Sequence, residues 1–447
     1  MKSRTDHLVR VLGLAFGLAA VVGSVVGQGI LRSPGVVAQS SGSPAVLIGL
    51  WVVGAALAML AALPYAELGA AIPKAGGPIA FAERAFGRRM VVVTAFTLVL
   101  MNLSSVALLA YVTSEFLARL GVGAELGVGP VATLLMVLFF VSNAIGTRVS
   151  GAIQVALSSI KGLVLIALVI ALFAQPGAPP FDTALPAVSA GWYGFGAALL
   201  VIFSAYSGWG DVVNYGEDIA DPGRAVPRAL FGGILGIAAL YLAVNLALLY
   251  ALSPLELARS DFAAADAARG LLGANGDMVF TLFGVFSVGA ITNLGLMTSS
   301  RVVFATAREG ILPQWFAHVS ERGTPLRALG LATIASMIFL WSDAYIALIA
   351  TSVALAQCVF VLVALSAIRL RKSEPDMPRP FAMPFFPLTG YLVLAFDLLL
   401  LAVFVAQDPY YSLLGLVLVA GLSAGYLLLA RLRKNAPSAI IELPPGG

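Results

Sequence analysis

Long apolar runs, separated by short polar segments, follow one another along nearly the whole chain. Each run approaches the roughly 20 residues with which an α-helix crosses a bilayer, and none alternates like a membrane β-strand. The pattern predicts an all-α polytopic membrane protein with twelve transmembrane helices. The predicted spans are 11–31, 44–63, 90–117, 131–145, 153–173, 193–215, 230–252, 278–306, 326–341, 345–368, 385–405 and 411–429.

Two of these runs are interrupted by glycine-rich stretches, GSVVGQGI at 23–30 and FSAYSGWG at 203–210. Irregular backbone persists at membrane depth only where protein, water or a ligand satisfies its N–H and C=O groups. Breaks at matching positions of two halves indicate an inverted-repeat transporter with its site between the halves. Close helix packing through glycine is the alternative explanation.

This pairing also sets the predicted organisation, which is one transmembrane domain over residues 1–447. The expected inverted repeats are 11–173 and 193–368, with helices 1 and 6 discontinuous, and 385–429 supplies two additional helices. No polar segment is long enough for a separate soluble domain.

The two breaks predict a cradle for the charged ends of an α-amino acid. Backbone N–H groups of Gly27, Gln28 and Gly29 would begin a half-helix, whose positive end favours a carboxylate. Carbonyl groups that end a half-helix would accept hydrogen bonds from an ammonium group. The candidate carbonyls are those of Val25, Phe203, Ser204 and Ser207.

Two polar residues lie in the middle of other runs. Asn102, in the third run, is a candidate polar wall for the substrate side chain, and an interhelical hydrogen bond explains it equally well. Lys161, in the fifth run, is costly to bury unless it is paired. We interpret Lys161 as a fixed or titratable cation that contacts the first break, with snorkelling to the interface as the alternative.

Charged residues at the ends of the runs are candidates for gating ion pairs, namely Glu67, Glu217 and Arg228, with Arg84, Arg88 and Arg301 nearby. Ordinary solvated charge at the membrane interface explains them equally well.

The basic residues also indicate an orientation. With a cytoplasmic N-terminus, 21 of the 26 Lys and Arg lie on the cytoplasmic side. Arg32, Arg119, Arg259 and Arg269 lie outside, and Lys161 lies within a span. Because basic residues in short loops stay in the cytoplasm, both termini are expected there. The net charge of +4 then reflects topology and requires no nucleic-acid partner.

Enzymatic chemistry finds little support in the sequence. The one cysteine, Cys358, cannot form an intrachain disulfide, and the two histidines, His7 and His318, lie in polar flanks. No Cys, His and carboxylate cluster has metal-ligand spacing, so no metal and no cofactor is expected.

Four stretches together resemble the amino acid-polyamine-organocation (APC) superfamily, and the resemblance covers nearly the whole chain. They are GSVVGQGILRSPG (23–35), YAELGAAIPKAGGPIAFAERAFG (65–87), FSAYSGWGDVVNYGEDIADPGRAVPRAL (203–230) and SRVVFATAREGILPQWFAHVSERGTPLRAL (300–329). The resemblance implies the leucine-transporter-like fold of five plus five helices, alternating access, and amino acid transport without sodium.

The resemblance also implies roles for particular residues. Lys161 is similar to the lysine that bacterial relatives of the L-type amino acid transporters carry in place of a sodium site. The head-group contacts of the family fall on Val25, Gly27, Gln28, Gly29, Ser204, Ala205 and Ser207.

Three departures from the family pattern limit which residue roles and which substrate specificity can be transferred from the family to this chain. Gln28 stands where relatives usually have serine, and Ser204 replaces an aromatic residue that often gates the site. Arg32 follows the first break, where relatives usually carry an apolar residue. The loop 121–130 lacks the cysteine that animal L-type chains use to bind a glycoprotein, so no disulfide-linked accessory subunit is expected.

The sequence thus predicts a sodium-independent secondary amino acid transporter of a bacterial inner membrane, embedded in lipid, that exchanges small or neutral amino acids or couples them to protons. A cationic amino acid or polyamine permease should offer acidic residues deep in the third, sixth, eighth or tenth run, and none is evident there. A non-transporting amino acid sensor is the more remote alternative.

Overall fold

The computed structural model describes residues 8, 10–176, 191–260, 262–273, 275–341 and 345–435. These residues form helices, and besides them only two isolated bridges occur in this part of the chain. Nine helical segments within it are long and apolar enough to cross a membrane, and three further apolar helices are shorter. The chain is therefore a multi-pass helical membrane protein, which confirms the predicted fold class at this level.

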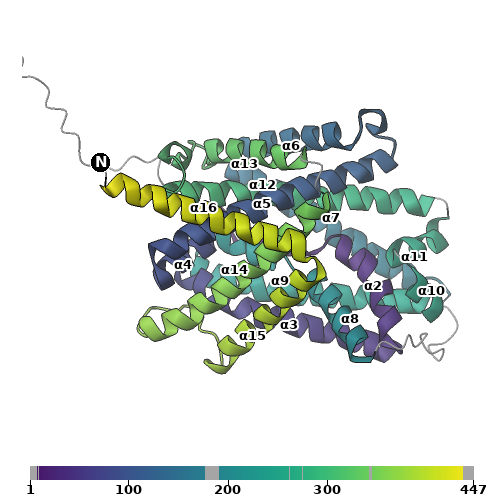
Figure 1. Ribbon diagram of the computed structural model, residues 1–447. Coiled ribbons are helices and arrows are strands. Elements are labelled where there is room, and N and C mark those ends of the chain that lie inside the picture. The colour runs from purple at the N-terminus through teal and green to yellow at the C-terminus, as the bar shows by residue number, and fades with distance from the viewer. Residues whose placement is uncertain are drawn as a thin grey trace, which may run out of the picture.

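The long helices run side by side through most of the molecule (Figure 1). They are α3 (Pro44–Ala71), α5 (Arg88–Arg119), α7 (Thr147–Phe173), α9 (Pro222–Ala251), α12 (Asn275–Arg308), α14 (Tyr345–Ser373), α15 (Leu388–Gln407) and α16 (Pro409–Asn435). The three shorter apolar helices are α1 (Leu14–Val25), α6 (Val128–Ala144) and α13 (Leu326–Leu340). Helix α2 (Gln28–Ser41) follows α1, and α8 (Gly191–Ala205) precedes the second break.

Connecting helices mark the two ends of the bundle. At one end lies α4 (Gly77–Phe86), and at the opposite end α10 (Pro254–Arg259) and α11 (Ala263–Leu272) pack on α2 (Figure 1). Three short 3₁₀ helices complete the set, namely η1 (Ala124–Leu126), η2 (Trp209–Asn214) and η3 (Gln314–Ala317). The two ends are called the α4 end and the α10–α11 end below.

Helix α1 lies in the centre of the largest core cluster and packs against α7, α9, α12 and η2. Lipid is as apolar as leucine, so membrane helices associate through close packing of small residues. Gly17 of α1 shows this, because a Cβ atom added there would lie 2.8 Å from the Cβ of Ala229 on α9. Most apolar side chains of α1 are buried, whereas Leu14 is exposed, and Phe16 and Tyr215 stack edge to face at 5.1 Å.

The structure differs from the predicted spans where hydropathy is a poor guide. The first run divides into α1 and α2, and α2 continues past the predicted end at residue 31 to Ser41. Residues 253–277, predicted as a polar segment, include α10, which begins with a capping box of Ser253 and Glu256. Hydropathy identifies apolar stretches. It does not detect helices such as α2 and α10, which contain polar residues or are stabilised by a cap.

Candidate functional site

The two breaks lie against each other inside the helix bundle. Helix α1 ends at Val25 and α8 ends at Ala205. Gly208 has φ +112°, and a Cβ atom added there would lie 2.9 Å from the Cβ of Ser24. On the other side of the contact, a Cβ atom at Gly29 would lie 3.0 Å from the Cα of Ala205. Only glycine permits an approach this close, so both breaks form one continuous region.

Side chains from α7 and α12 bind the carbonyl groups that the first break leaves free. Lys161 Nζ on α7 donates to Gly23 O at 2.7 Å and to Val26 O at 3.0 Å. The Ser287 hydroxyl on α12 donates to Val26 O at 3.1 Å. These bonds supply the partners that irregular backbone requires at membrane depth.

The ammonium of Lys161 lies inside the protein, not at the membrane interface. Its residue is 0% exposed, and both of its hydrogen-bond acceptors are carbonyls of the first break. Snorkelling therefore does not describe its position. A cation with two carbonyl acceptors has the surroundings that a bound metal cation would have, and the role of Lys161 as its substitute stays a prediction.

One phenol joins the two breaks. Tyr241 Oη on α9 lies 3.1 Å from Val25 O and 3.2 Å from Ala205 O, the last carbonyls of α1 and α8. Since a phenol has one hydrogen, it is shared between these acceptors. Tyr241 is fully buried and stacks against Trp51 and Tyr206.

The carbonyls predicted to bind an ammonium group already have local partners in the second break. Phe203 O accepts from the Ser207 hydroxyl at 3.0 Å and from Tyr206 N at 3.1 Å, and Ser204 O accepts from Ser207 N at 3.1 Å. In the first break, Val25 O accepts from Tyr241. A substrate ammonium would use the second lone pair of these oxygens or displace a local bond.

The remaining predicted contacts lie in different surroundings. Gly27 lies between α1 and α2, and the side chain of Gln28 falls outside the described residues. Ser204 is exposed. Asn102 is buried on α5, and its Nδ2 donates to Leu98 O of the same helix at 2.8 Å, so this bond is intrahelical, unlike the predicted alternative.

Comparison with known proteins identifies the family. The sequence model of a family described as "Amino acid permease" matches residues 12–419. The chain belongs to this family, which is part of the APC superfamily.

Curated relatives of the permease are amino acid transporters. It is 28% identical to the serine/threonine exchanger SteT of Bacillus subtilis (strain 168) over 95% of this chain and 98% of that protein. It is 29% identical to the Asc-type amino acid transporter 1 of Mus musculus, over 92% and 79% of the two chains. The b(0,+)-type amino acid transporter 1 of Rattus norvegicus is 27% identical, over 89% and 83%. The permease is an amino acid transporter and no enzyme.

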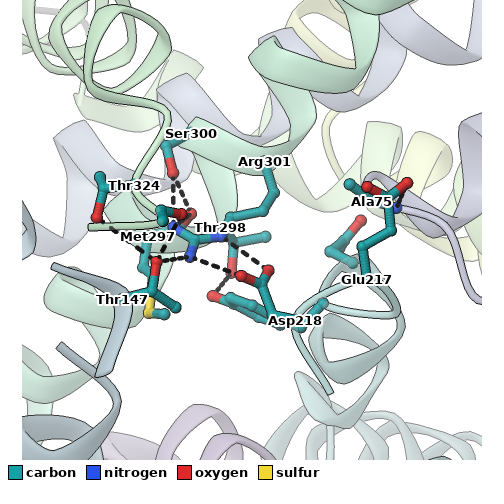
Figure 2. A network of polar contacts seen from close by, with 12 residues as sticks. Ala75, Thr147, Glu217, Asp218, Met297, Thr298, Ser300, Arg301 and Thr324 are labelled. Atoms are coloured by element: carbon teal, nitrogen blue, oxygen red, sulfur yellow. Dashed lines mark hydrogen bonds and ion pairs between the residues drawn. The ribbon is translucent and has the colours of Figure 1, made fainter. Parts of the chain in front are cut away.

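A buried ion pair holds the α4 end of the permease together (Figure 2). Arg301 on α12 donates from Nε and Nη2 to the Asp218 carboxylate at 3.2 and 3.3 Å, and the two side chains are 1% and 0% exposed. Arg301 Nη2 also donates to Thr147 Oγ1 at 3.0 Å, where α7 begins. Burial raises the pKa of Asp218, and the Arg301 guanidinium opposes that rise.

The backbone of Asp218 connects this pair to the segment before α1. Leu12 N donates to Asp218 O at 2.9 Å, and Ala220 N donates to Leu12 O at 2.8 Å. Thr147 Oγ1 in turn donates to Gly323 O at 2.9 Å, in the segment before α13. The network thus joins the chain before α1, the segment after η2, and the ends of α7 and α12.

The predicted gating residues lie in three different surroundings. Glu217 binds Arg308 at 2.5 Å and accepts from Ala75 N at 3.1 Å, so it joins α12 to the segment before α4 (Figure 2). Glu67 was expected near Arg84, Arg88, Arg228 and Arg301, but its carboxylate binds Arg371 and Arg379. Arg228 is exposed on α9, and none of the ion pairs found among the described residues includes it.

The contacts of Glu67 describe a fixed junction. Its residue is 0% exposed, and it accepts from Arg371 at 2.6 and 2.8 Å, from Arg379 at 3.1 Å and from Met383 N at 2.7 Å. These bonds tie α3 to the connection between α14 and α15.

Sequence reasoning missed two carboxylates inside the spans. Asp211 lies in η2, within the sixth predicted span, so the statement that no acidic residue occurs deep there was wrong. Asp397 lies near the middle of α15 and is 1% exposed. An ionisable residue inside an apolar run is the signal that could have identified both.

Among the residues that the structure describes, no group of three or more His, Cys, Asp or Glu side chains could hold a metal ion.

Proposed function

We propose that the permease is a sodium-independent secondary active transporter of small or neutral amino acids. The observation that carries this proposal is the contact between the two breaks, Gly208 against Ser24 and Gly29 against Ala205. This arrangement brings the start of α2, with its free N–H groups, close to the end of α8, with its carbonyls. A zwitterion has one charge for each of these helix ends.

The head-group site of this proposal consists mainly of backbone. The N–H groups of Gly27, Gln28 and Gly29 receive the carboxylate. The ammonium group is accepted near Val25, Ser204, Ala205 and Ser207, with Asn102 as a candidate polar wall. Two relatives support small substrates, since one is named a serine/threonine exchanger and the other an Asc-type amino acid transporter.

In this proposal Lys161 replaces a sodium ion. Its ammonium occupies the carbonyls of Gly23 and Val26, which would otherwise be available to a metal cation. A fixed positive charge makes the first break independent of sodium, because a second cation beside it would be repelled.

Alternating access would act through two inverted repeats, 11–173 and 193–368, that rock about the breaks, with 385–429 as additional helices. Tyr241 is the hinge contact, since it binds the last carbonyl of each half-helix. The network of Arg301 and Asp218 is the gate at the α4 end, and opening requires that its bonds separate.

We place the permease in a bacterial inner membrane with the α4 end in the cytoplasm. The excess of Lys and Arg in the segments at that end supports this orientation. Both termini would then be cytoplasmic.

A cationic substrate is the second candidate. Asp211 favours it, because this carboxylate lies in η2, whose N-cap Gly208 packs against Ser24 of the first break. A cationic amino acid or a polyamine would need such a negative charge in the pocket.

The test is counterflow into liposomes that contain the purified permease. Labelled L-serine, L-alanine, L-leucine and L-lysine are offered outside, with and without the same unlabelled amino acid inside, in sodium-free buffer. When no pH gradient is imposed, serine or alanine should accumulate only in preloaded vesicles. Accumulation of lysine alone would contradict the proposal of a neutral substrate and support a cationic one.

A further inference from the structure

Two carboxylates inside the spans lie outside every ion pair found among the described residues. They are Asp211 in η2 and Asp397 in α15. An ionised carboxylate at membrane depth is costly unless a cation pairs with it, and a bound proton removes that cost. The cations near the breaks are already engaged, Lys161 with backbone carbonyls and Arg301 with Asp218.

Asp211 lies in η2, beside the first break. Gly208 is the N-cap of η2, and a Cβ atom added there would lie 2.9 Å from the Cβ of Ser24. The Ser24 hydroxyl donates its one hydrogen to Ala20 O at 2.6 Å, so it has no second hydrogen to donate to a carboxylate.

Tyr65 on α3 packs both on η2 and on α14. The centroid of its ring lies 5.4 Å from that of Phe360 on α14, about one helical turn from Gln357. Its ring stacks edge to face on Trp209 at 5.2 Å, and its Cε1 would lie 3.1 Å from a Cβ atom at Gly210. Tyr65 therefore packs directly on the turn of η2 that carries Asp211.

Asp397 ends this series of polar groups. The side chain of Gln357 on α14 donates to Asp397 Oδ1 at 3.3 Å and to Asp397 O at 3.1 Å, and both residues are buried. Tyr65 thus packs between η2, which carries Asp211, and the turn of α14 whose Gln357 binds Asp397.

We propose that Asp211 and Asp397, with Tyr65 between them, form an intramembrane acid pair that binds the proton coupled to amino acid movement. The proposal deepens the transport function and rests on it. One carboxylate oxygen takes a proton from water on the side to which the site is open, and the neutral acid returns it to water on the other side. Because Asp211 belongs to the second break, any movement of η2 against α1 and α3 changes its distance from Ser24 and Tyr65.

Arg224 and Arg228 on α9, which packs against η2, are exposed, and further titratable groups near η2 and α15 have partners elsewhere. They are Glu67 with Arg371 and Arg379, Glu83 with Lys74, Arg84 with Glu374, Arg301 with Asp218, Arg308 with Glu217, Tyr215 with Thr298, Tyr241 with the carbonyls of Val25 and Ala205, and Tyr426 with Gly310. Cys358 on α14 is partly buried.

The experiment measures protons and amino acid in the same liposomes. A trapped pH-sensitive dye reports proton entry, and labelled L-serine reports uptake, so that each variant yields a ratio of protons to serine molecules. The variants are Asp211→Asn, Asp397→Asn and Tyr65→Phe, with Asp397→Glu as the conservative change. Asp376→Asn, on the exposed loop between α14 and α15, is the matched control.

Wild type and Asp376→Asn should acidify the vesicle lumen during serine uptake, with the same ratio. The ratio should fall to the background of protein-free vesicles in Asp211→Asn and Asp397→Asn, and Asp397→Glu should restore it. An unchanged ratio in both Asn variants would overturn the acid pair.

Counterflow without a pH gradient separates this inference from the transport function. Serine counterflow by wild type, with no proton entry during net serine uptake into vesicles that contain no serine, would overturn the acid pair and leave transport standing. Stimulated uptake of lysine but not serine by wild type, abolished in Asp211→Asn, would overturn it as well, because Asp211 would then bind a cationic substrate. A monodisperse elution profile for each variant excludes misfolding as the cause.

Discussion

At the scale of single residues, the breaks depend on a few side chains that satisfy backbone groups. Lys161 is the main one, with two charge-assisted bonds to Gly23 O and Val26 O. Hydrogen bonds to charged groups contribute about 1.5–3 kcal/mol each.

Lys161→Ala should therefore abolish most transport. A loss of about 1.5 kcal/mol from even one of these bonds corresponds to roughly tenfold in rate. Serine counterflow should fall by at least that factor at every pH tested. Ser159→Ala is the control, because Ser159 is exposed on the same helix and bonds only Val155 O within it. Wild-type counterflow and binding by Lys161→Ala would reject the role of the lysine.

The second prediction at this scale concerns a glycine of the second break. Gly208→Ala should lose transport and unfold at lower temperature, because φ +112° strains an L-residue and its Cβ atom would meet Ser24. Gly162→Ala on α7 is the matched control, since nothing lies within 4 Å of its added Cβ atom. Equal melting temperatures and equal counterflow for Gly208→Ala and Gly162→Ala would refute the close contact.

Some of these residues were predictable and others were not. Both glycine-rich breaks and Lys161 interrupt apolar runs, which makes them visible in one dimension. Asp211 and Asp397 carry the same signal and were overlooked. The partners of Glu67 could not be predicted, because Arg371 is 304 positions away and only the folded chain brings the two together.

At the scale of elements, one helix connects the two half-helix ends. Helix α9 packs against α1 and η2, and its Tyr241 binds the last carbonyls of α1 and α8. Hydropathy predicted α9 as a plain span, and nothing in the sequence indicates that its tyrosine lies at both breaks. The connecting helices α4, α10 and α11 were likewise unpredicted, since short amphipathic helices have no long apolar run.

Tyr241→Phe should weaken the coupling between the half-helices. It removes one shared hydrogen bond of about 1 kcal/mol and leaves two buried carbonyls with one partner fewer. We expect serine counterflow to slow by roughly five- to tenfold, with the ring stacking on Trp51 preserved. Tyr250→Phe, on the same helix with its hydroxyl bonded to Gln175 O, should transport like wild type. Unchanged counterflow in Tyr241→Phe would show that the phenol is not part of the hinge.

At the scale of the whole molecule, the α4 end is held by more ionic bonds than the breaks are. The buried pair of Arg301 and Asp218 joins four segments, and Glu217 with Arg308 adds a partly buried pair beside it. Removing one partner of a buried pair leaves an uncompensated charge, at a cost of about 3–5 kcal/mol.

Arg301→Gln should therefore open the α4 end and lower the melting temperature. Cys358 is the one cysteine of the chain, so Cys358→Ala with Ser207→Cys creates a single reporter at the second break. An impermeant maleimide applied from the α4 end should label it faster once Arg301 is replaced. Arg84→Gln, which breaks the exposed pair with Glu374 at the same end, is the control. Equal labelling rates in both backgrounds would contradict the gate.

The most direct test of the whole account is serine or alanine counterflow by the purified permease in sodium-free liposomes. The account predicts that preloading with the same amino acid stimulates uptake, and that adding sodium leaves that uptake unchanged. Absence of stimulated uptake for every amino acid of the panel, with or without a pH gradient, would contradict it.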